Sequence, residues 1–175
     1  MRKIIILLLL IPFSVKSQDL ANNFKIGDYI EVYNDDSLRI YFSCTGALVS
    51  KKCAEYYREG KADQRYVNIS GRFIDYYVDG TKALEATMVN NYLVGEATYY
   101  YENGKIKSEG KYLKDEKIGT WRYYYRSGRI EKVVNYIEGI PFIEESYGAL
   151  GRKKVSNREG KYQEPSMCGL LLMTG

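Results

Sequence analysis

Strand-forming aromatic residues and glycine turns alternate along most of this chain, and the alternation repeats at a fixed interval. Residues 95–104 read GEATYYYENG and residues 119–128 read GTWRYYYRSG, so the two copies begin 24 residues apart. A weaker copy, GRFIDYYVDG, occupies residues 71–80. A fixed period of this length indicates a repeat architecture in which each unit is one supersecondary motif.

Each copy predicts a β-hairpin. Tyr, Trp, Ile and Val favour strands because aromatic and β-branched side chains pack well on a pleated surface. The dipeptides at residues 79–80 and 103–104 are Asp-Gly and Asn-Gly, which can adopt the positive φ angles of a tight turn. Turns are expected at Asp36, Gly60, Gly80, Gly104, Gly128 and Gly151.

Apolar residues do not recur at helical spacing between residues 27 and 155. Polar segments such as LKDEKIG carry the chain from one hairpin to the next. We therefore predict an all-β fold, a single-layer antiparallel meander of stacked β-hairpin repeats.

The start of the chain predicts an export signal. It reads MRKIIILLLLIPFSVKS, with two basic residues, a short apolar run and small residues at its end. This is the order of a secretory signal peptide, and we place cleavage after Ser17. The apolar run is well short of the roughly 20 residues that span a bilayer. A retained anchor is the alternative, and membrane association is otherwise expected to be peripheral at most.

These patterns divide the chain into four parts. The signal peptide covers residues 1–17, irregular N-terminal repeats cover 18–70, the repeat array covers 71–155, and a capping segment or tail covers 156–175. The tail ends KYQEPSMCGLLLMTG and fits no repeat. We expect this tail to form a strand that covers the last open edge of the sheet. An interface segment and a disordered end are the alternatives.

The net charge argues against nucleic-acid binding. The chain carries 26 Lys and Arg against 22 Asp and Glu, and the signal peptide holds three of the basic residues and no acid. Cleavage therefore leaves 23 basic against 22 acidic residues, interspersed along the chain. Nucleic-acid binding needs a basic stripe or patch, which this mixed surface does not provide.

Three cysteines raise the question of disulfides. In an oxidising compartment Cys44 and Cys53 are candidate partners, because YFSC and CAEYY resemble two strands around a loop. Two buried thiols are the alternative, and Cys168 is left over. Without any His, a cysteine-only zinc site would lack its fourth ligand, so no metal is expected.

The aromatic rows are the candidate binding surface. Side chains alternate across a strand, so Trp121, Tyr123 and Tyr125 share one face. Aromatic residues and Arg are enriched at binding hot spots. A protein partner is expected, with a glycan or envelope polymer as a second option, and stabilisation of a thin sheet as the competing role. The candidate patch comprises Trp121, Tyr123, Tyr125, Tyr99, Tyr101, Arg122 and Arg126.

No catalytic motif is found in the sequence. The absence of His excludes the Ser-His-Asp and Cys-His arrangements. Carboxylate pairs occur at residues 35–36 and 144–145, but adjacent residues of a strand point to opposite faces. Phosphate-binding glycine loops are absent, and no cofactor is expected. We expect a protein that is not an enzyme.

The best copies, GTWRYYYRSGRIEKVVNY and GEATYYYENGKIKSEGKY, resemble the MORN repeat, and more closely its bacterial variant in YwqK-like antitoxin proteins. The resemblance covers residues 71–151 well and 27–70 loosely, and it departs from the pattern at Ala97 and at IEGIPF. It implies an elongated, twisted sheet with roles in scaffolding, protein binding and sometimes membrane association.

Together with the export signal, the resemblance leads us to expect a protein–protein interaction or scaffold module of a bacterial cell envelope. Its expected location is the periplasm, the cell surface or the extracellular space. An immunity or antitoxin-like protein that binds a secreted toxin is the first alternative. A small glycan-acting envelope enzyme is the second.

Overall fold

The computed structural model describes residues 26–34, 37–62 and 69–158. The predicted signal peptide, the predicted turn at Asp36, Cys168 and most of the predicted capping segment lie outside these residues. What the sequence predicts for those segments stays a prediction.

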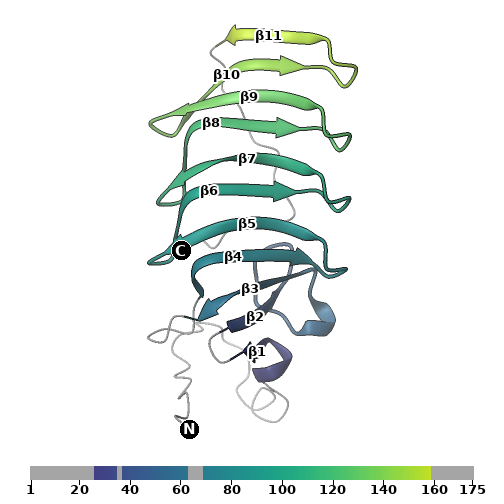
Figure 1. Cartoon of the computed structure of the whole chain (residues 1–175), viewed down its shortest axis with the longest axis vertical. Coiled ribbons are helices and arrows are strands. Elements are labelled where there is room, and N and C mark those ends of the chain that lie inside the picture. Colours follow the sequence, from purple (N-terminus) through teal and green to yellow (C-terminus); the bar gives the residue numbers. More distant parts are fainter. Residues whose placement is uncertain (1–25, 35–36, 63–68, 159–175) are drawn as a thin grey trace, which may run out of the picture.

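The described residues form one antiparallel sheet of eleven strands, arranged in chain order from β1 to β11 (Figure 1). Short 3-10 helices lie at η1 (Ile26–Asp28) and η2 (Lys51–Cys53). The predicted all-β meander is confirmed, and strands in the 30–62 region belong to the same sheet as the regular repeats. The strands are β1 (Ile30–Asn34), β2 (Ser37–Phe42), β3 (Tyr56–Ala62), β4 (Ile69–Tyr77), β5 (Lys82–Val89), β6 (Tyr92–Tyr100), β7 (Ile106–Leu113), β8 (Glu116–Tyr124), β9 (Ile130–Ile137), β10 (Ile140–Tyr147) and β11 (Lys153–Arg158).

Turns alternate between the two sides of the sheet from β4 onwards (Figure 1). We call one side the glycine rim, and it comprises residues 78–82, 102–106, 126–130 and 150–154. We call the other side the tight-turn rim, and it comprises residues 89–94, 113–118 and 137–142. On the tight-turn rim, two-residue turns such as Asn90-Asn91 adopt positive φ at both positions, which matches the twist of the flanking strands.

The turn predicted at Gly60 is wrong, because Gly60 lies inside β3 and pairs with Leu38 and Phe73. A Cβ at this position would lie 2.5 Å from Ile69 Cγ2 and 3.1 Å from Phe73 Cβ. Glycine is needed here because neighbouring side chains lie over the backbone.

Each repeat begins with a β-bulge. Gly71, Gly95 and Gly119 lie within strands and have φ angles of +85°, +72° and +60°. At the last of these, three residues of β8 (119–121) face the single residue Gly110 of β7. A bulge bends its strand and disturbs the local ladder, so the 24-residue glycine marks a bend repeated along the sheet.

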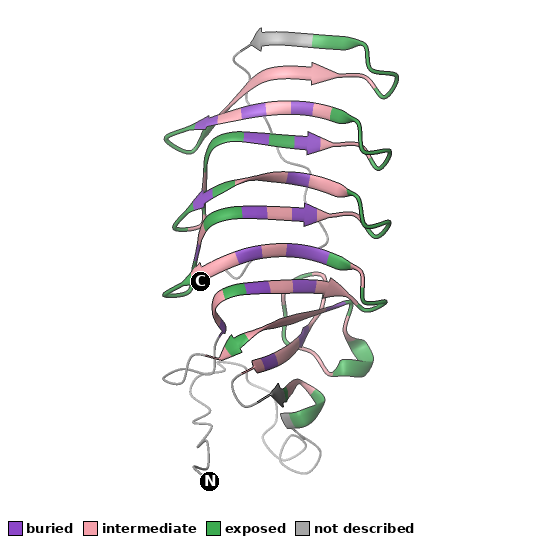
Figure 2. Cartoon of the chain, viewed as in Figure 1, coloured by how far each residue is buried: buried purple, intermediate pink, exposed green. Residues whose placement is uncertain are grey.

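The two faces of the sheet differ in chemistry. The ring face carries the apolar core, which includes Phe73, Leu84, Tyr99, Tyr112, Trp121, Tyr123, Val134 and Tyr136. The opposite, charged face carries cross-strand pairs such as Arg39–Glu59 and Arg72–Glu85. Buried and partly buried positions alternate along β4, β5 and β9, as Figure 2 shows. The period of two follows from the pleat.

Tyrosine hydroxyls tie successive repeats together near the glycine rim. The hydroxyl of Tyr101 donates to the backbone carbonyl of Tyr124 at 2.7 Å. Equivalent bonds join Tyr77 to the carbonyl of Tyr100 at 2.8 Å and Tyr125 to the carbonyl of Tyr147 at 2.7 Å. The last tyrosine of each of these three runs is therefore a cross-repeat hydrogen-bond donor.

An ion pair is buried on the ring face between β3 and β4. Arg58 donates two hydrogen bonds to the carboxylate of Asp75, at 2.6 and 2.9 Å, and its guanidinium lies 4.0 Å from the ring centroid of Phe73. Burial raises the pKa of Asp75, and the charge of Arg58 opposes that rise. Removing either partner would leave a buried charge without its counterion.

The predicted disulfide between Cys44 and Cys53 is absent from the structure. Cys53 is a free, exposed thiol in η2, and Cys44 lies in the loop after β2. The ladder between β2 and β3 ends at the pair Phe42–Tyr56, so neither cysteine occupies a cross-strand position.

Candidate functional site

The aromatic patch predicted from the sequence is not one exposed surface. Trp121 is 0 % exposed, Tyr123 5 % and Tyr99 7 %, so these three residues belong to the core. Arg122 is exposed on the charged face, and Arg126 is exposed on the glycine rim. The sequence showed which side chains share a face, but it did not show which face is covered.

The indole ring of Trp121 occupies the centre of the ring face. The rings of Tyr112, Tyr99, Tyr123 and Tyr136 surround it, with centroids 5.0 to 6.3 Å away. Its Nε1 donates to the backbone carbonyl of Lys111 at 3.1 Å, which satisfies the indole N–H. Trp121 therefore stabilises the sheet, and it is not available as a contact residue.

Two lysines extend over this ring cluster. The ammonium group of Lys117 lies 4.6 Å from the Trp121 ring centroid, and that of Lys132 lies 4.5 Å from the Tyr123 centroid. Both distances are within the range of cation–π interactions. The equivalent positions of the preceding repeat are Leu93 and Ser108, so sequence reasoning based on the repeat gave no reason to expect cations here.

Tyr101 and Tyr125, the remaining aromatic members of the patch, are partly buried and donate the cross-repeat hydrogen bonds described above. The guanidinium of Arg126 lies 5.3 Å from the Tyr101 ring centroid and pairs with Glu102 at 2.6 Å. Of the seven predicted residues, Arg122 is therefore the one whose side chain faces a surface depression.

That depression is a groove of about 580 Å³ on the charged face. Three consecutive strands build it, and they include both well-matched copies of the repeat. The lining residues are Glu96, Ala97, Thr98, Glu109, Gly110, Lys111, Ile118, Gly119, Thr120 and Arg122.

The bulge at Gly119 creates the groove. Here β8 carries three residues opposite Gly110 of β7, so the ladder is interrupted and backbone is exposed between the strands. A Cβ at Gly110 would point to the Trp121 ring on the opposite face, so on the groove side it is the exposed Gly119 that leaves the gap unfilled. The groove floor is therefore backbone, which offers hydrogen-bonding groups to a ligand.

Charged and polar side chains form the walls of the groove. Lys111 and Glu96 form a loose ion pair at 3.7 Å, with side chains 61 % and 84 % exposed. The hydroxyl of Tyr124 donates to Glu109 at 2.6 Å, and burial, reinforced by Glu109, raises the pKa of Tyr124 to about 12. Arg122 forms no ion pair with another residue of the part described, so its guanidinium is free to bind a carboxylate or a backbone carbonyl.

A second groove occupies the same place in the repeat, 48 residues earlier. It measures about 380 Å³ and is lined by residues of β2, β3 and β4, including Gly60, Arg72 and Ile74. The position of Arg122 is taken by Ile74 there. The two grooves differ in size and charge because different side chains line them.

Neither Glu144 nor Glu145 lines the groove. Across residues 26–34, 37–62 and 69–158, no three His, Cys, Asp or Glu residues are grouped to hold a metal ion. Glu145, one of the acids considered for catalysis, is paired with Lys153 and Tyr147, which hold its pKa below the usual value. Asp35 and Asp36 lie outside the described residues.

Comparison with known protein families identifies two repeats. The family model described as the MORN repeat variant matches residues 93–114 and 117–138, which are the segments that build most of the larger groove. MORN repeats indicate a repeat protein involved in protein or membrane interactions, and the family is generally non-enzymatic. None of the curated proteins compared matches the chain. Among the described residues, no helix is long and apolar enough to cross a membrane.

Proposed function

We propose that this protein is an exported, non-enzymatic repeat protein that binds another protein in the cell envelope and acts there as an interaction or scaffold module. The proposal rests chiefly on the groove of the charged face, because it coincides with the two repeats that match the family model. The bound partner is a polypeptide segment whose backbone and acidic side chains meet the groove floor and Arg122.

The rigidity of the groove supports this role. Its three strands are paired on both sides of the bulge, and Tyr101 fastens β8 to the preceding turn through a 2.7 Å hydrogen bond. A preformed surface loses little conformational entropy on docking, so more of the contact free energy remains as affinity. The volume of the groove, about 580 Å³, also lies within the range of typical ligand pockets.

Partner capture from envelope extract tests the proposal. The wild-type chain and the Arg122→Ala variant serve as bait, and Arg126→Ala is the matched control, because it removes an exposed arginine outside the groove. We expect wild type and Arg126→Ala to recover the same protein and Arg122→Ala to lose it by about tenfold. Equal recovery by all three proteins would rule out the groove as the binding site.

The identity of the captured protein separates the finer roles. A single tightly bound toxin would assign the protein to the immunity or antitoxin-like class, whereas an envelope protein would assign it to scaffolding. Export is tested separately by mass spectrometry of the protein from a cell fraction. We expect an N-terminus directly after Ser17, and a chain that keeps residues 1–17 would contradict it.

A further inference from the structure

A row of exposed apolar side chains follows the tight-turn rim on the charged face. Val89, Leu113 and Ile137 occupy the same position in three successive repeats and are 46 %, 57 % and 53 % exposed. Tyr92, Ile118 and Ile140 lie beside them, and these six residues are called the apolar rim below. Single exposed apolar residues are ordinary, whereas exposed apolar residues gathered in one patch mark interaction sites.

The tight turns explain why these side chains share one face. Val89 pairs with Tyr92 across the first turn, and Ile137 pairs with Ile140 across the third. Their neighbours Leu93 and Tyr136 point to the ring face, where they are buried. Because side chains alternate along a strand, the rim residues must point to the other face, away from the core.

We propose that the apolar rim is a self-association surface, on which a second copy of this chain docks in antiparallel orientation about a two-fold axis near Leu113. The inference goes beyond the proposed function and does not depend on it. In this arrangement Leu113 meets Leu113 of the second copy, and Val89 of each copy meets Ile137 of the other. All three positions are apolar, so the surface is self-complementary, as a two-fold interface requires.

The spacing of the row favours a second copy over other partners. Neighbouring strands lie about 4.8 Å apart, so Val89, Leu113 and Ile137 recur about every 9.6 Å. A helix with one apolar residue per heptad repeats every 10.5 Å or so, which fits the row less closely than a second copy of the same repeat does. Another array of the same repeat keeps every contact in register.

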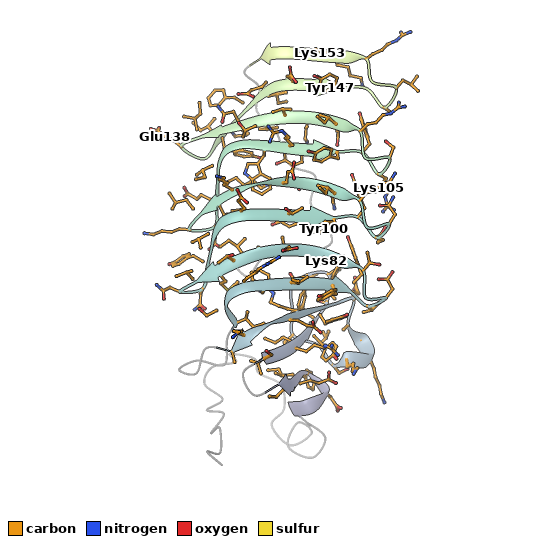
Figure 3. The ribbon with its side chains drawn as sticks, viewed as in Figure 1. Lys82, Tyr100, Lys105, Glu138, Tyr147 and Lys153 are labelled. Atoms are coloured by element: carbon orange, nitrogen blue, oxygen red, sulfur yellow. The ribbon has the colours of Figure 1, made fainter. Side chains whose placement is uncertain are left out.

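The charges of the two rims point the same way. The glycine rim carries seven basic residues and two acids, and Figure 3 shows Lys82, Lys105 and Lys153 on that side. Two such rims would repel each other. The tight-turn rim, where Glu138 lies, carries Lys114 against Asp115, Glu116 and Glu138, while the ammonium group of Lys117 lies over the Trp121 ring on the opposite face. Two tight-turn rims therefore repel each other less than two glycine rims do.

The size of the rim indicates a weak dimer. The apolar rim contains six residues, far fewer than the roughly 20–30 residues that a standard interface uses on each side. We therefore expect a dissociation constant on the order of 0.1 mM.

Sedimentation equilibrium of the whole protein at about 5 to 500 µM tests the proposal. We expect a monomer–dimer equilibrium that Leu113→Glu weakens by at least about tenfold, because two new carboxylates would meet at the axis. The matched control is Val78→Glu, which changes a 61 % exposed valine on the glycine rim and should leave the equilibrium unchanged. A monomer at every concentration would overturn the proposal. So would a dimer that Val78→Glu weakens and Leu113→Glu does not.

A charge-swap variant tests the orientation. Val89→Glu and Ile137→Lys should each weaken the dimer alone, whereas the double variant should restore it, because antiparallel docking joins each new glutamate to a new lysine. A parallel dimer would instead place like charges together, and the double variant would be weaker than either single one. Circular dichroism and the melting temperature check that each variant is folded. We expect folding to be preserved, because the substituted side chains are exposed.

Discussion

The ring of Trp121 lies directly on the backbone of Gly110, so that a Cβ at residue 110 would come within 2.3 to 2.5 Å of three indole ring atoms. The tryptophan is fully buried, and four tyrosine rings surround it. The largest side chain of the core thus depends on the absence of a side chain on the neighbouring strand. This relationship explains why a residue chosen from sequence as a binding anchor is part of the fold.

Gly110→Ala is expected to destabilise the protein by about 1–3 kcal/mol, because the added methyl group forces the buried ring to move. Urea unfolding followed by circular dichroism measures the change. Gly27→Ala is the matched control, since nothing lies within 4 Å of a Cβ there, and it should stay within about 0.5 kcal/mol. Equal effects of the two changes would contradict the packing argument.

Tyr101→Phe is expected to lower the free energy of unfolding by about 0.5–1.5 kcal/mol, because the carbonyl of Tyr124 loses its hydroxyl donor. Tyr77→Phe and Tyr125→Phe remove the equivalent bonds and should have similar effects. Tyr92→Phe, at a 48 % exposed ring, serves as the control with little change. If all four variants unfold alike in urea, the cross-repeat hydrogen bonds do not contribute to the free energy of unfolding.

Arg58→Ala should lower the free energy of unfolding by about 3–5 kcal/mol, because it leaves the buried carboxylate of Asp75 without its counterion. Burial already raises the pKa of Asp75, and the loss of the Arg58 charge raises this pKa further. The loss of stability should therefore be smaller in acid, where the carboxyl of Asp75 is neutral. Replacing both residues, by Arg58→Met with Asp75→Leu, should recover much of the stability. Denaturation at several pH values checks these expectations, and a loss independent of pH would contradict them.

Stability should also fall in alkali. Burial raises the pKa of Tyr77 from 10.0 to about 12, and burial with Glu109 does the same for Tyr124. A folded-state pKa above the unfolded value favours the neutral hydroxyl, so this stabilisation is complete below pH 10 and is lost as the pH rises towards 12. Thermal melts should show this decline, and Tyr77→Phe with Tyr124→Phe should flatten it. An equally steep decline in the double variant would assign it to other groups.

The candidate site shows the limit of reasoning from the repeat. Arg122 was predicted as a contact residue and does line the groove, whereas the groove itself was not predicted. Its cause is the unequal number of residues facing each other at Gly119 and Gly110, which depends on strand register. Hydrophobic periodicity does not reveal such a bulge, although the recurring glycine at the start of each repeat was a signal for it.

The sequence by itself determined the 24-residue period, the hairpins and the class of the fold, because turn chemistry and strand propensity are local properties. Only the tertiary structure decided which face became the core, because alternation along a strand gives two faces without saying which is covered. It also decided the role of Gly60, which lies beneath side chains of β4 rather than at a turn. Glycine serves both purposes, and contacts between distant residues choose between them.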